Sequence, residues 1–289
     1  MVPVSDADII SMIAARMSVP LRYNLWRQCL HPARKRLSLF SGFEYRNAIV
    51  RVRSSHGYSL CTDILGSIQM QQNKVYLFVF ETLADWEYGY AVAGINNPQF
   101  QKNANRYKVV TVGATTEAIR TIGGVRIIPD VAIDNVSLSD SALLILPGGT
   151  AWDEGKNGEA AELAARFISN KIPVAAICGA TAGLAKAGLL DKTKHTSNSQ
   201  EYLAATNYKG AAHYVNAPAV RGGDLITASA MAPVDFAREI FSCLDLYSDE
   251  VLDAWYGLFK TGDGKYFQQI MKAIGANNSV EPKPLRGSA

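Results

Sequence analysis

Cys178 is the residue whose surroundings most clearly predict chemistry. It follows the apolar run from Pro173 to Ile177 and precedes the small residues Gly179-Ala-Thr-Ala-Gly183. We therefore place it where a buried strand turns sharply into a helix, the arrangement of a nucleophile elbow. A helix N-terminus favours a thiolate, which lowers the thiol pKa below its reference value of about 8.5. We predict that Cys178 is a nucleophile; the alternative is a structural cysteine in an apolar strand.

Two glycine turns are candidates for an oxyanion hole. Gly149 ends the turn Pro147-Gly148-Gly149 after an apolar run, and Gly179 directly follows the cysteine. Their backbone N–H groups would converge if the two preceding strands are neighbours in a sheet. Taken alone, the first turn is more typical of a simple tight turn. Trp152, just after it, either lines a pocket or is a structural aromatic residue.

The other cysteines indicate no metal or disulfide framework. Cys29, Cys61 and Cys243 form no CxxC pair and no Cys/His spacing of the zinc-site type. Cys243 lies on the apolar face of an expected helix and should belong to the core. We expect no cofactor and no metal.

The elements that would position Cys178 alternate between strand and helix from residue 74 onward. This order predicts a three-layer α/β/α sandwich with a mainly parallel, flavodoxin-like central sheet. A hairpin is expected around Gly123-Gly124. The expected strands are 75–80, 107–114, 119–122, 125–128, 142–146, 173–177 and 225–228, with a further possible strand at 213–215, and the expected helices are 86–95, 159–169, from 179 to about 190, 233–246 and 249–259.

Three regions are expected along the chain. Residues 1–69 hold nine Arg/Lys against four Asp/Glu and no sustained periodicity, so we predict a basic extension, poorly ordered or appended, or else a small accessory segment. Residues 70–262 form the α/β domain. Residues 263–289 form a helix end and a flexible, polar tail.

Charge and hydropathy limit the partners that we expect. The net charge of +3 comes from the leading segment, where HPARKR and RVR lack a recognisable nucleic-acid-binding fold. No apolar run approaches the roughly 18 to 20 residues that span a bilayer. We therefore expect a cytoplasmic protein that binds neither membranes nor nucleic acid.

The motifs LPGG, AAICGATAG, GLL followed by HTSN, and LITASAMAPVDFAREIF resemble the PfpI / DJ-one superfamily, also called class I glutamine amidotransferase-like proteins. The resemblance runs from Val75 to Leu246 and continues through AWYGLFKTG into a YoaZ-like branch. It implies that Cys178 is the reactive cysteine and that Glu87 is the glutamate after the first strand. Buried beside a thiolate, Glu87 would donate a hydrogen bond to sulfur and shuttle a proton; the alternative is a solvated charge.

The same resemblance implies that His195 is a general base or polarises the site, although an isolated histidine is more often a surface residue. His213 is a weaker candidate. True glutamine amidotransferases carry a late His-x-Glu pair, and this chain reads LITASAMAPVDFARE there. Ammonia transfer from glutamine is therefore not expected.

Several functions fit these residues. The resemblance implies a cysteine enzyme acting on a carbonyl electrophile: an intracellular protease or amidase, a glyoxalase acting on methylglyoxal, or a deglycase. A redox sensor or stress-protective chaperone, in which Cys178 oxidises to a sulfinate, needs nearly the same residues. A binding protein with a vestigial site is a third possibility. The resemblance also implies a homo-oligomer, a dimer or larger.

Overall fold

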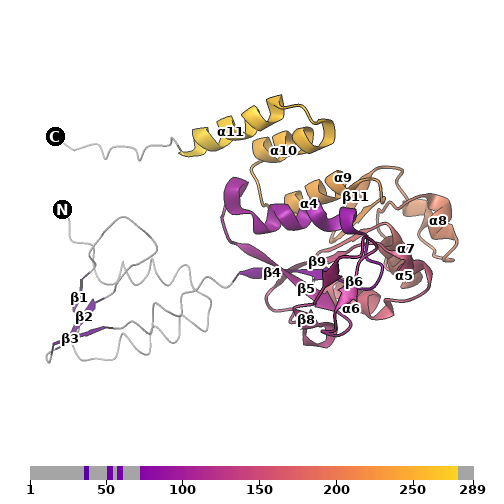
Figure 1. Ribbon diagram of the computed structural model, residues 1–289, viewed down its shortest axis with the longest axis horizontal. Coiled ribbons are helices and arrows are strands. Elements are labelled where there is room, and N and C mark those ends of the chain that lie inside the picture. The colour runs from indigo at the N-terminus through magenta and orange to yellow at the C-terminus, as the bar shows by residue number, and fades with distance from the viewer. Residues whose placement is uncertain (1–35, 39–50, 55–56, 61–71, 279–289) are drawn as a thin grey trace. The chain divides into compact units, whose positions relative to one another are not determined.

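The computed structural model describes residues 36–38, 51–54, 57–60 and 72–278 (Figure 1). The chain divides into two compact units, Met1–Gln71 and Gln72–Ala289, close to the boundary expected at residue 69. The first unit contains an antiparallel sheet of β1 (Arg36–Ser38), β2 (Arg51–Ser54) and β3 (Gly57–Leu60). The sequence analysis did not predict these strands; the rest of the expected extension lies outside the described residues.

The second unit is built on a seven-stranded sheet with the order β11-β12-β10-β9-β4-β5-β8. All pairings are parallel except β11 with β12, so the mainly parallel α/β sandwich is confirmed. The strands are β4 (Asn73–Phe78), β5 (Tyr107–Gly113), β8 (Val131–Ala132), β9 (Ser141–Leu146), β10 (Val174–Ile177), β11 (Ala219–Gly222) and β12 (Leu225–Ala228).

The central strands are largely apolar and buried because helices cover both of their faces. All four residues of β10 and of β12 are buried. The helices are α4 (Asp85–Asn96), α5 (Thr150–Asp153), α6 (Gly158–Ser169), α7 (Gly179–Lys186), α8 (Gln200–Ala204), α9 (Pro233–Cys243), α10 (Asp249–Thr261) and α11 (Lys265–Asn278).

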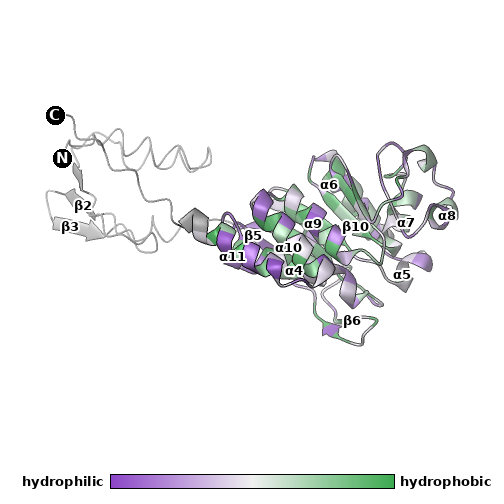
Figure 2. Cartoon of the chain, turned by 90° about the horizontal axis from the view of Figure 1, so that it is seen from above, coloured by the Kyte–Doolittle hydropathy of each residue, from purple (hydrophilic) through white to green (hydrophobic). Residues whose placement is uncertain are grey.

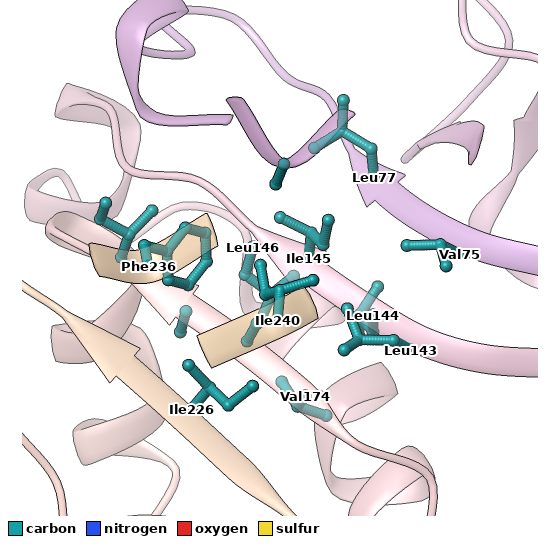
Figure 3. Close-up of a cluster of buried hydrophobic side chains, with 14 of the residues drawn as sticks. Val75, Leu77, Leu143, Leu144, Ile145, Leu146, Val174, Ile226, Phe236 and Ile240 are labelled. Carbon is teal, nitrogen blue, oxygen red and sulfur yellow. The ribbon is translucent and has the colours of Figure 1, made fainter. Parts of the chain in front are cut away.

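Two groups of helices form the outer layers. Helices α4 and α9 pack on each other, with α10 against α9, while α5 and α6 contact α7. Figure 3 shows Phe236 and Ile240 of α9 among the side chains of β9, β10 and β12. In Figure 2, α10 and α11 carry both hydrophobic and hydrophilic residues, as helices with one covered face do.

Some elements differ from the expectation. The hairpin strands are shorter, β6 (Ile119–Arg120) and β7 (Arg126–Ile127), although they pair around Gly123-Gly124 as predicted. Residues 213–215 are not a strand: a 3-10 turn, Ala211–His213, is followed by a single bridge between His195 and Tyr214. The short strand β11 and helix α5 were not predicted, because four residues carry little periodicity.

Helix α11 was not among the expected helices, although a helix end was expected within residues 263–289. Its apolar residues recur at helical spacing, and Ile270 is fully buried. The Tyr266 ring reaches α10 at Gly257, where an added Cβ would lie 2.4 Å from the ring. The absence of a side chain at Gly257 therefore lets the two helices pack closely. Among the described residues, no helix has the length and apolarity needed to cross a membrane.

Candidate active site

Cys178 lies between β10 and α7, where the sequence places it. Its backbone has φ 57° and ψ −125°, a conformation that non-glycine residues seldom adopt. The Cys178 N–H donates to the carbonyl of Ala228 over 3.0 Å, and its own carbonyl accepts from the N–H of Thr181 over 3.1 Å. Such a backbone costs about 1–3 kcal/mol and persists because the surrounding structure holds it. The cysteine is thereby turned out of the strand at its carboxyl end.

Glu87 lies beside the thiol, in the first turns of α4. Only 1% of Glu87 is exposed, and its Oε2 accepts a hydrogen bond from the N–H of Gly148 over 2.5 Å. Its Oε1 is buried without a hydrogen-bond partner among the described residues. A Cβ added at Gly148 would lie 2.8 Å from Glu87 Oε2 and 2.9 Å from Cys178 Sγ. Glu87 and Cys178 therefore meet where Gly148 leaves room for them.

The two acids affect each other's protons. Burial raises the pKa of Glu87 to about 7, although hydrogen bonds with Gly148 and Cys178 act in the opposite direction. Burial, followed by the charge of the Glu87 carboxylate, raises the pKa of the Cys178 thiol to about 12. The expectation of a thiol pKa lowered by the helix N-terminus is therefore wrong: burial and the carboxylate outweigh the helix. Removing one proton from the pair leaves a single proton that the carboxyl and the thiol share.

Asn198 makes a third contact with the thiol that the sequence analysis missed. Its side-chain Nδ2 lies 3.5 Å from Cys178 Sγ. Asn198 stands three residues after His195 within the HTSN motif, so the motif indicated this loop without singling out Asn198. An amide at this position donates a hydrogen bond but cannot accept a proton as a base.

Both ring nitrogens of His195 meet groups other than the thiol, so its role as a general base stays a prediction. The ring is buried, with Nδ1 2.8 Å from the Thr193 carbonyl and Nε2 3.3 Å from the Tyr208 hydroxyl. Because a carbonyl only accepts, Nδ1 carries the proton. Burial lowers the pKa of His195, which favours this neutral ring. His213 is a neighbour of His195, whose N–H donates to the His213 carbonyl.

The two glycine turns predicted as an oxyanion hole lie at the same edge of the sheet. Strands β9 and β10 are parallel neighbours, with Leu146 opposite Ala176. The backbone N–H of Gly179 acts to lower the pKa of the Cys178 thiol. A Cβ added at Gly179 would lie 3.1 Å from the Gly149 carbonyl oxygen. The two turns therefore meet, and a role for their N–H groups in binding an oxyanion stays a prediction.

Trp152 is structural rather than a wall of the site. It is buried, and its Nε1 donates to the Pro147 carbonyl over 2.9 Å. Its ring lies so close to Gly183 of α7 that an added Cβ would be 2.2 Å away. Gly183 therefore allows Trp152 to support the helix that starts at Cys178.

The loop that carries Asn198 is tied to its neighbours on both sides. The hydroxyls of Ser197 and Thr181 are 2.6 Å apart, which joins the loop to α7. The Thr196 N–H donates to the Thr227 hydroxyl of β12 over 2.8 Å. Beyond the loop, the Tyr202 hydroxyl of α8 donates to Asp153 of α5 over 2.5 Å. The last bond links two helices that flank the thiol.

A three-layer α/β fold with a cysteine on a strand-to-helix turn and a buried glutamate beside it defines the class of this protein. A model of the DJ-1/PfpI family matches residues 73–242, which is more than half of the chain. The chain therefore belongs to the DJ-1/PfpI family. Among the described residues, no group of three His, Cys, Asp or Glu side chains is placed to hold a metal ion.

Several relatives are similar over most of their length. The Bacillus subtilis protein named uncharacterized protease YoaZ is 43% identical over 208 residues, covering 71% of this chain and 99% of the relative. Uncharacterized protease YdeA of the same organism is 29% identical over 184 residues, covering 62% and 87%. The crystal structure of a thiJ/pfpI family protein from Bacillus anthracis has a TM-score of 0.67 and 45% identity, covering 70% of this chain and 97% of that one.

Proposed function

We propose that this protein is a cysteine-dependent enzyme that acts on a carbonyl electrophile, with Cys178 as the nucleophile. The observation that supports this most directly is the buried Glu87 carboxyl beside the thiol, held by the Gly148 N–H. A carboxyl with a pKa of about 7 both donates and accepts a proton near neutral pH. A neutral thiol must lose its proton in order to attack a carbonyl, and this carboxyl can accept that proton.

The first step is addition of the thiol to the carbonyl. A bond forms between Sγ and the carbonyl carbon as the C=O π bond breaks, and the thiol proton passes through Glu87 to the oxygen, giving a hemithioacetal. The N–H groups of Gly179 and Gly149 are the donors proposed to stabilise the oxygen while it is negative. Asn198 donates to the sulfur as the thiolate forms. Atoms and charge balance without a cofactor.

The arrangement favours a small 2-oxoaldehyde such as methylglyoxal as substrate. After addition, one carboxyl suffices to take a proton from the former aldehyde carbon and return it to the neighbouring carbon, while the hydroxyl proton passes to the oxygen on that neighbouring carbon. The product is a 2-hydroxyacyl thioester of Cys178. Water then releases the hydroxy acid and the thiol. Hydrolysis of a peptide amide also requires a proton for the leaving nitrogen, and both ring nitrogens of His195 already have other partners, the Thr193 carbonyl and the Tyr208 hydroxyl. Peptide amides are the second class of electrophile to test, because two relatives are named as proteases.

Turnover assays separate these activities. Loss of methylglyoxal with formation of the hydroxy acid, and cleavage of a chromogenic peptide amide, should be followed for wild type, Cys178→Ser and Cys243→Ser. Cys243 is the matched control, because it is a partly buried thiol on α9. We expect methylglyoxal turnover in wild type and Cys243→Ser and none in Cys178→Ser. Equal turnover in Cys178→Ser would refute the proposal.

A redox function is the alternative, supported by the unpartnered Oε1 of Glu87. The Cys178 thiolate would attack one oxygen of hydrogen peroxide and break the O–O bond, giving a sulfenic acid and a hydroxide that takes a proton from Glu87 to become water. A second peroxide would oxidise the sulfenic acid to a sulfinic acid, which ionises to a sulfinate, with release of a second water. A protonated Glu87 would donate to a sulfinate oxygen. Mass spectrometry after mild peroxide should then detect a gain of two oxygen atoms at Cys178. Stoichiometric oxidation together with no turnover on either substrate would favour this function over the enzyme.

A further inference from the structure

We infer that Asn198 is a positioning residue for Cys178, and that the backbone N–H of Ala230 fixes the amide so that its nitrogen faces the sulfur. This inference rests on the proposed role of Cys178 as the reactive thiol. Asn198 Nδ2 lies 3.5 Å from Sγ, and Asn198 Oδ1 lies 3.0 Å from the Ala230 nitrogen. The amide thus bridges the thiol and the chain that follows β12.

The Ala230 contact determines which end of the amide meets the thiol. A backbone N–H only donates, so the atom it meets must be the amide oxygen. The nitrogen therefore points at Sγ, and a flipped amide would place two donors against each other at Ala230. A donor at this position stabilises a thiolate more than a thiol, because hydrogen bonds to charged groups are the stronger ones.

The backbone around Asn198 is held in place. The residues on its N-terminal side are bound through the Thr196 N–H to Thr227 and through Ser197 to Thr181. On its C-terminal side, the Ser199 hydroxyl accepts from the Tyr202 N–H over 3.1 Å and caps α8. These contacts hold the backbone on both sides of Asn198, and the Ala230 N–H holds its exposed side chain. Such a supported side chain is suited to set the direction of the sulfur.

The charges around Cys178 determine what replacing Asn198 would do. Glu87 of α4 faces the thiol directly, and its carboxylate opposes the thiolate. Tyr202 of α8, held by Asp153 of α5, lies within electrostatic reach of both groups. Asn198 is thus a neutral donor in a site where the Glu87 carboxylate opposes negative charge on sulfur. Its loss should raise the thiol pKa and slow the reaction of Cys178 at any fixed pH.

Alkylation of Cys178 by iodoacetamide against pH, read by peptide mass spectrometry, tests this inference. Asn198→Asp keeps an oxygen for the Ala230 N–H but turns the second oxygen to the sulfur as an acceptor. We expect the rate constant near neutral pH to fall about 10-fold or more, the equivalent of losing one hydrogen bond to a charged group. Asn198→Ala removes the donor without adding charge and should shift the profile in the same direction.

Asn96→Asp is the matched control. Asn96 Oδ1 also accepts from a backbone N–H, that of Val109, over 3.0 Å, but at the far end of α4 from Glu87. Its alkylation profile should equal that of wild type. Wild-type profiles in both Asn198 variants would overturn the inference. Because no substrate is present, the result is separate from the proposed function, which fails only if Cys178→Ser retains turnover.

Discussion

The N–H of Gly148 donates to Oε2 of Glu87 over 2.5 Å, which joins the turn after β9 to the buried first turns of α4. This bond holds an acid in the interior next to a second acid, Cys178. The pKa of Glu87 rises to about 7 because burial penalises its charged form more than the Gly148 N–H favours it. Four predictions follow from this arrangement.

Glu87→Gln should change how stability depends on pH. Glu87 has a pKa of about 7 in the folded protein against a usual 4.5, so its contribution is complete below pH 4.5 and is lost as the pH rises through 7. The shift corresponds to about 3 kcal/mol. In urea unfolding, wild type should lose roughly that much stability between pH 4.5 and pH 8 relative to Glu87→Gln, whose amide does not titrate. A constant difference between the two proteins across this range would contradict the pKa assignment.

Gly148→Ala should disrupt the pair. The added Cβ would lie 2.6 Å from Cys178 Cβ and 2.8 Å from Glu87 Oε2, closer than packed atoms come. We expect a loss of about 1–3 kcal/mol in unfolding free energy from overpacking, and slower alkylation of Cys178.

Gly89→Ala is the control for that change, because no atom lies within 4 Å of a Cβ added at Gly89 in α4. It should increase stability by about 0.5–1 kcal/mol and leave alkylation unchanged. Equal effects of the two alanine variants would mean that Gly148 does not need to be a glycine.

His195→Ala should lower stability without moving the pH profile of the thiol. It leaves the Thr193 carbonyl and the Tyr208 hydroxyl without their partner, at a cost of about 1–3 kcal/mol by urea unfolding. The alkylation profile of Cys178 should keep its shape. If the alkylation rate of Cys178 in His195→Ala no longer rose near pH 7, His195 would be the base that controls the thiol.

Much of the fold was predictable from the sequence because buried parallel strands are apolar along their length. The runs at 142–146 and 173–177 gave β9 and β10, and their neighbouring positions brought the two glycine turns together. Helix α11 was missed because Gly275 and two asparagines made its end look like a tail, whereas Ile270 and Tyr266 bind it to α10. Long-range packing decided where this helix ended.

Only the site residues that lie in a recognisable local sequence pattern could be predicted. Cys178 was found from the strand and the small residues after it, and Glu87 from a motif. Which residue of the HTSN loop contacts the thiol depends on the path of the loop in three dimensions, which the sequence pattern does not give. In the structure, Asn198 contacts the thiol, and the His195 ring packs against the rings of Tyr208 and Tyr214. The direction of the thiol pKa also needed the structure, because it depends on burial and on Glu87.

Alkylation of Cys178 against pH in wild type and Glu87→Gln tests the central claim, that the thiol and the Glu87 carboxyl are one coupled acid pair. In wild type, the pair loses its first proton near the Glu87 pKa of about 7, so the fraction with a thiolate beside a protonated carboxyl should rise there. Glu87→Gln should lack that rise and react only at alkaline pH, because burial alone still raises the thiol pKa. Identical profiles, each with the midpoint of a free thiol near about 8.5, would contradict the account.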